Sequence, residues 1–125
     1  MNFTGIIDSV VSALSASLGC NVGYISAERG LDDRVAVVRP ANLSITKGLL
    51  NNCLLSYDVA LPVSYSFRVR NKLDNYKTEM ERFIGAMTVV ASLPGVVRVS
   101  VDVPELDQED EMMTINGSVT MSGQY

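Results

Sequence analysis

The chain offers few side chains with which to do chemistry, because its 125 residues include no histidine. This excludes histidine-based catalytic triads and every zinc site that uses a histidine ligand. Its two cysteines, Cys20 and Cys53, cannot by themselves complete a four-ligand zinc site. We expect both to be reduced and to act as small buried hydrophobic side chains. No phosphate-binding loop or nucleophile elbow occurs. Only carboxylates, Lys or Tyr remain for catalysis, and no catalytic cluster of them stands out, so we predict no enzymatic activity, metal or cofactor.

An acidic run near the C-terminal end holds five of the fourteen carboxylate residues within seven positions. Its members are Glu105, Asp107, Glu109, Asp110 and Glu111. The run lacks the turn glycine and the flanking helices of a calcium-binding loop. One interpretation is a solvated connection between two strands. The other is a negative surface that repels a passing polyanion or docks a basic partner.

A local basic bias covers the end of one apolar segment and the start of the next. Its members are Arg68, Arg70, Lys72, Lys77 and Arg82, diluted by Glu79 and Glu81. The chain as a whole carries a net charge of −4, which argues against ordinary nucleic-acid binding through a basic patch. We therefore interpret Arg68, Arg70 and Lys72 as a solvated face, or as ion-pair partners of a neighbouring subunit.

Length and composition predict one folded domain over residues 1–125, because 47% of the residues are hydrophobic and 19% are charged. The N-terminal apolar segment contains no Lys or Arg before Arg29 and is interrupted by Asp8, so we expect no signal peptide. No stretch approaches the roughly 20 apolar residues of a membrane span. We expect a protein made in the cytoplasm with no membrane partner.

A long alternating segment organises the chain. Its apolar members occupy every second position, as in a strand with one buried face, and they are Leu55, Tyr57, Val59, Leu61, Val63, Tyr65, Phe67 and Val69. At about 3.3 Å per residue, residues 55–70 would extend roughly 53 Å. Pro62 cannot donate a ladder hydrogen bond, so we expect a kink, a bulge or an exposed edge there. A strand this long with uncovered ends favours association with other chains.

The next segment changes to helical spacing. Its apolar positions are Leu73, Tyr76, Met80, Phe83, Ile84, Met87, Val90 and Ala91. A helix over residues 72–92 would cover about 31 Å, less than the strand before it. We predict that this helix packs on the apolar face of the strand, with Gly85 in close contact with the sheet.

Shorter patterns complete the fold prediction. Residues 3–18 predict a helix that stops at Gly19, and residues 21–27 and 34–39 predict two strands joined as a hairpin. Residues 41–54 predict a loop or extended arm, and two closing strands follow over 96–103 and 113–121. The order α-β-β-β-α-β-β predicts a two-layer α+β domain: a largely antiparallel sheet of about five strands with two helices mainly on one face.

Several segments together resemble the tail terminator, or tail completion, proteins of long-tailed bacteriophages. They are FTGIIDSVVSALSASLG, VAVVRP, LSYDVALPVSYSFRVR, DNYKTEMERFIGAMTVVASLPG, VVRVSVDV and MMTINGSVTM. The resemblance lies in element order, size and patterning over nearly the whole chain. It implies a catalytically silent virion protein of the neck that forms a hexameric ring. That ring would cap the tail tube protein and meet the head–tail connector, with DNA passing through the lumen without sequence-specific binding.

Two other interpretations stay open. The chain could be another neck component, such as a head-completion or connector protein, which only its contacts would separate from a terminator. It could also be a small cytosolic ligand-binding or enzymatic α+β domain, which would need a concave pocket with convergent polar groups.

Overall fold

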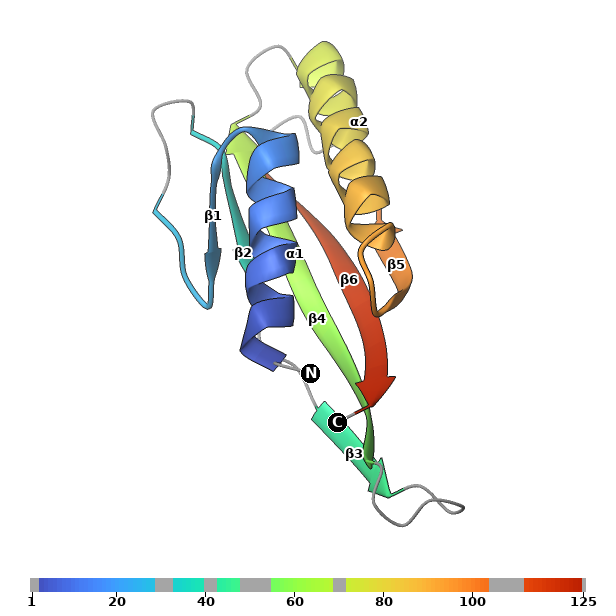
Figure 1. The fold of residues 1–125 in the computed structure, drawn as a ribbon. Coiled ribbons are helices and arrows are strands. Elements are labelled where there is room, and N and C mark those ends of the chain that lie inside the picture. Colours follow the sequence, from blue (N-terminus) through green and yellow to red (C-terminus); the bar gives the residue numbers. More distant parts are fainter. Residues whose placement is uncertain are drawn as a thin grey trace.

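The computed structural model describes residues 3–28, 33–39, 43–47, 55–68, 72–103 and 112–124 of the protein. The elements are α1 (Phe3–Leu18), β1 (Asn21–Tyr24), β2 (Val35–Val38), β3 (Leu43–Lys47), β4 (Leu55–Arg68), α2 (Lys72–Ala91), β5 (Val96–Asp102) and β6 (Met112–Gln124). Both helices lie on one side of a single sheet (Figure 1). The predicted two-layer α+β class is confirmed.

The sheet has the strand order β1-β2-β4-β6-β5, with β3 paired to β4 off this path. β4 and β6 form its centre as a long antiparallel ladder from Ser56 opposite Gln124 to Arg68 opposite Met112. Residues 112–124 form one strand that continues through Gly117, so the predicted closing strand over 113–121 is confirmed. Six strands replace the predicted five, because the segment expected to be a loop or an extended arm contains β3, which pairs antiparallel with residues 55–59.

β1 and β2 pair in parallel, so the predicted hairpin is wrong. The start of each strand lies next to the C-terminal end of α1. β1 follows Gly19 closely in the chain, and Arg34, just before β2, donates hydrogen bonds to the carbonyls of Leu18 and Gly19 at 2.7 and 3.2 Å. Two strands that start at the same end of a sheet run in the same direction.

Pro62 lies between the part of β4 that pairs with β3 and the part that pairs with β2. Of the predicted kink, bulge or exposed edge, the exposed edge describes this position best. β2 pairs with β4 from Val63 onward, and β3 pairs with β4 up to Val59. Arg39 donates its N–H to the Pro62 carbonyl at 2.8 Å, so the backbone of Pro62 faces this gap and away from β6. Its missing N–H therefore leaves the β4–β6 ladder intact.

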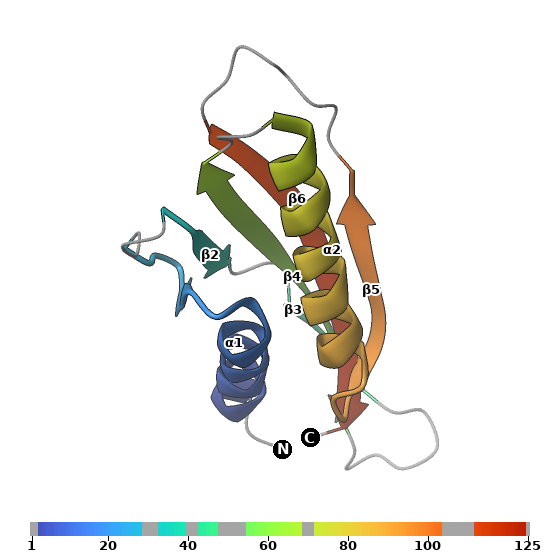
Figure 2. The same ribbon diagram turned by 90° about the horizontal axis from the view of Figure 1, so that it is seen from above.

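Both helices lie over one face of the sheet (Figure 2). The core consists of buried side chains from the helices and from this face. α1 contacts α2 and β1, and α2 contacts β5 and β6. Alternate residues of β4 point into this core, and Leu61, Val63, Tyr65 and Phe67 are at most 1% exposed. The helix stripe contributes Met80, Phe83, Met87 and Val90 to the core. The predicted packing of this helix on β4 holds only in part, because α2 lies mainly against β5 and β6 and reaches β4 through Phe83 and Glu79, which contact Tyr65.

Gly19 directly follows α1, as predicted, and Gly95 lies in the turn between α2 and β5. Gly19 has a φ of 65° and Gly95 a φ of 87°, the left-handed conformation that glycine adopts at low cost. Gly85, however, does not contact the sheet. It is exposed, and a Cβ added there would meet no atom within 4 Å, so the predicted close approach at Gly85 is wrong.

Candidate interaction surfaces and the buried polar network

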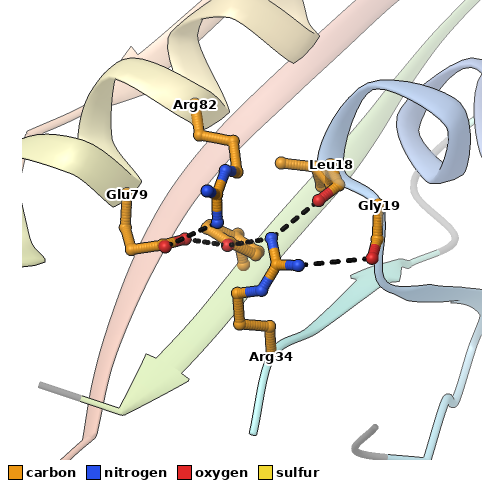
Figure 3. Close-up of polar contacts among 6 residues, drawn as sticks. Leu18, Gly19, Arg34, Glu79 and Arg82 are labelled. Atoms are coloured by element: carbon orange, nitrogen blue, oxygen red, sulfur yellow. Dashed lines mark hydrogen bonds and ion pairs between the residues drawn. The ribbon is translucent and has the colours of Figure 1, made fainter. Parts of the chain in front are cut away.

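A polar network crosses the core where four elements meet (Figure 3). Glu79 on α2 is only 6% exposed, and its carboxylate accepts hydrogen bonds from the Tyr65 hydroxyl and from Arg82 Nη1 at 2.7 Å. Arg34 extends from the start of β2 and donates to the Tyr65 hydroxyl at 3.5 Å as well as to the end of α1. The network therefore joins α1, β2, β4 and α2.

Burial and the adjacent Glu79 carboxylate raise the pKa of Tyr65, and Arg34 opposes this shift only in part. The phenol therefore stays protonated at neutral pH and acts as a hydrogen-bond donor. Its ring packs against Phe83, with centroids 5.6 Å apart and planes 11° apart, and against Phe67 at 5.5 Å. Enclosed aromatic packing of this kind leaves no room for a substrate, so we interpret the network as structural.

The sequence interpretation placed Glu79 among surface charges, and the structure buries it instead. Its position carried a usable signal. Glu79 follows Tyr76 by three positions and precedes Phe83 by four, which places it within the apolar stripe of α2. A carboxylate at such a position requires a buried hydrogen-bond donor, and Tyr65 provides one.

The predicted basic residues do not form one patch among the described residues. Arg68, at the end of β4, places its Nε 3.2 Å from Asp33 of the same chain. Lys72 begins α2, but its side chain and all of Arg70 lie outside the described residues. Arg82 is engaged with Glu79. The role of Arg68, Arg70 and Lys72 at a subunit interface stays a prediction.

The predicted acidic run also lies outside the described residues, since Glu105, Asp107, Glu109, Asp110 and Glu111 all fall between β5 and β6. Cys53 lies outside as well, whereas Cys20 is half-buried and packs against the core. The described part of the chain contains no group of three or more Cys, Asp or Glu side chains arranged to hold a metal ion.

One end of the sheet extends beyond both helices (Figure 1). At about 3.3 Å per residue the 14 residues of β4 span roughly 46 Å, against about 30 Å for the 20 residues of α2. In β3, Leu43 is opposite Val59 and Ile45 is opposite Tyr57, so both stand on the apolar face of the sheet. They are 41% and 55% exposed. We call this region, Leu43 and Ile45 with the paired start of β4, the projecting end.

The face of the sheet opposite the helices is covered by small polar side chains. Its central members are Ser56, Ser64, Ser66, Thr114, Asn116, Ser118, Thr120 and Ser122. Two cross-strand contacts order it: Ser64 Oγ lies 3.1 Å from Asn116 Oδ1, and the hydroxyls of Ser66 and Thr114 are 2.9 Å apart. This open face is polar and at least partly exposed, and its sparse charges distinguish it from a nucleic-acid-binding surface.

The two edges of the sheet differ. Along β1 the chain turns back on itself, since Asn21 Nδ2 donates to the Glu28 carbonyl at 3.0 Å and a Cβ at Gly23 would collide with the Ser26 carbonyl. β5 forms the other edge, and no described strand pairs with its outer side. A free edge of this length is a site where another strand can add.

A cavity of about 220 Å³ lies between the first turns of α1 and the turn before β5. Its lining is mostly apolar and consists of Gly5, Ile6, Ser9, Val10, Leu93, Pro94, Val96 and Met121. Ser9 supplies the one side-chain hydroxyl, which already donates to the Gly5 carbonyl at 2.9 Å. The cavity thus offers little to orient a polar ligand.

Comparison with known proteins found no matching family model and no matching curated protein. Among the described helices, neither combines the length and the apolar character that crossing a membrane requires.

Proposed function

We propose that this protein is a structural subunit of long-tailed bacteriophages, and that it forms a hexameric ring that terminates the tail. In this role it is a virion protein of the neck, made in the host cytoplasm. The tail tube protein binds one side of the ring and the head–tail connector binds the other. The proposal involves no enzymatic step and no cofactor.

The projecting end is the observation that carries this proposal. Leu43 and Ile45 expose apolar side chains on the face that the helices cover elsewhere. Water contact there is unfavourable by about 25 cal/mol per Å² of apolar surface, and a neighbouring subunit that covers the region removes this cost. The element order of the fold, which prompted the resemblance to tail terminators, supports the same role.

DNA passes through the ring without stable binding in this proposal. The net charge of −4 and the acidic run, with Glu105 and Asp107 at its start, would repel phosphates along a lumen. The uncharged hydroxyls of the open face likewise provide no counterion for a phosphate.

The test compares the mass of the purified protein alone and after mixing with isolated tail tubes, followed by imaging. The wild type should form rings of about six subunits or add density at one tube end. Ile45→Lys should remain folded, because Ile45 is 55% exposed, and should lose the ring or the tube contact. Ser44→Lys is the matched control, since it adds the same charge to the opposite face of β3.

Other outcomes separate the alternatives. Density on the head side in place of the tube end would indicate another neck component. A monodisperse monomer that ignores tubes would refute the proposal. The apolar cavity beside Ile6 and Leu93 would then become the first place to look for a small ligand.

A further inference from the structure

The exposed side chains of β5 are arranged symmetrically about Ser100. Arg98 and Asp102 are each two residues from Ser100 and carry opposite charges, and all three are exposed. Val97, at the β-bulge between Val96 and Arg98, and Val103, which directly follows β5, are each three residues from Ser100 and are 66% and 64% exposed. No other large hydrophobic side chain in the described ranges is as exposed as these two valines.

Among the described residues, the two charges on β5 have no partners. Arg98 is opposite Thr120, and Asp102 is opposite Asn116, so both lie on the open face of the sheet. Four residues of extended strand separate them by roughly 13 Å, which is too far for an ion pair. Within the described part of the protein, neither side chain makes a hydrogen bond or an ion pair.

The backbone of β5 is also available along its outer side. Ser122 donates its N–H to the Gly95 carbonyl at 3.0 Å, so alternate residues of β6, including Ser118, face β5. Ser100 is opposite Ser118 and therefore directs its own backbone groups toward β6. The alternation of a strand then turns the N–H and C=O groups of Val99 and Val101 outward.

We propose that β5 pairs antiparallel with β5 of a second copy of this protein, about a two-fold axis at Ser100. In this register the outward backbone groups of Val99 meet those of Val101 of the second copy. Arg98 is opposite Asp102 of the second copy at a non-hydrogen-bonded position, where cross-strand side chains approach most closely. Val97 and Val103 meet at both ends, so the two sheets join edge to edge.

The charges select this register and this partner. A shift of two residues leaves both charges without their partners, and a shift of one residue turns the outward backbone groups of one strand away from those of the other. Charges of one sign on β5 would repel a second copy, as edge strands often do, whereas Arg98 and Asp102 attract it twice. The contact is isologous, unlike the head-to-tail contacts of a cyclic ring, so it does not depend on the proposed neck function.

The decisive experiment is a charge exchange on the full-length protein, followed by sedimentation over a range of concentrations. Arg98→Asp and Asp102→Arg should each weaken dimerisation roughly tenfold or more, because two attractive pairs become two repulsive ones. The double variant should restore the dimer. Lys77→Asp and Glu81→Arg are matched controls that make the same charge changes on the exposed face of α2 and should leave the dimer unchanged.

Amide hydrogen exchange provides a second measurement that does not depend on the variants. Protection of Val99 and Val101 should rise with protein concentration, while Ser100 and Asp102, which face β6, should be protected at every concentration. A wild type that stays monomeric would overturn the proposal. So would single variants that dimerise like the wild type, or protection of Val99 and Val101 that appears only when a different protein is added.

Discussion

The Tyr65 hydroxyl donates a hydrogen bond to the Glu79 carboxylate between the sheet and α2. This contact lets a helix with a carboxylate in its apolar stripe pack against β4, since an unpaired charge there would be costly. It also joins a strand and a helix that follow each other in the chain, and Arg34 connects the same hydroxyl to the end of α1. The bond is therefore a structural link between both helices and the sheet.

Removal of that hydroxyl should weaken the fold without altering its shape. Tyr65→Phe keeps the ring packed on Phe83 but leaves Glu79 with one fewer donor, so the free energy of unfolding should fall by about 1–3 kcal/mol. Urea unfolding followed by circular dichroism measures this change. A double-mutant cycle with Glu79→Leu should show a coupling energy, and strictly additive single effects would contradict the contact.

The same contact makes the protein sensitive to alkali. Because the pKa of Tyr65 is raised in the folded state, the unfolded chain loses its phenolic proton first, from about pH 10. The unfolded state then binds fewer protons, so the free energy of unfolding falls as the pH rises above 10. Tyr65→Phe should lose this part of the pH dependence, measured as thermal midpoints from pH 8 to 11. Tyr24→Phe, in the edge strand β1, is the control and should show the same fall in stability above pH 10 as the wild type.

The fold was predictable from the sequence wherever a regular pattern decided it. Alternation gave β4 and β6, and helical spacing gave both helices and most of their core residues. The direction of β2 was not predictable, because it depends on Arg34 reaching Leu18, sixteen positions earlier in the chain. β3 was missed for a similar reason, since its alternating pattern is short and the segment forms a strand by pairing with the start of β4.

The candidate surfaces were predictable only in part. The length of the alternating segment predicted that the sheet would extend beyond the helices, and the projecting end in Figure 1 confirms this. The symmetry of Arg98 and Asp102 about Ser100 is visible in the sequence. It bears on pairing with a second copy only because β5 is an edge strand. Strand order is set by long-range pairing, which local patterns do not encode.

Arg34 should stabilise the C-terminal end of α1. Its guanidinium donates to the Leu18 and Gly19 carbonyls and places a positive charge at the negative end of the helix dipole. Arg34→Met should lower the free energy of unfolding by about 1–3 kcal/mol. Arg34→Lys keeps the charge without the forked donors, so an intermediate loss is expected in urea titrations. A methionine variant as stable as the wild type would show that the two bonds contribute nothing.

Two glycines should respond to alanine in opposite directions. Gly85 lies in the middle of α2 on its exposed face, and a Cβ there would meet no other atom within 4 Å. Gly85→Ala should therefore raise the free energy of unfolding by about 0.5–1 kcal/mol. At Gly117 an added Cβ would lie 2.8 Å from the Ser100 carbonyl oxygen and 3.1 Å from Met87 Cε. Gly117→Ala should therefore lower stability by about 1–3 kcal/mol, because the backbone of β5 must shift. Thermal and urea unfolding of both variants measure the difference. Equal effects at the two positions would contradict the packing of α2 and β5 on β6.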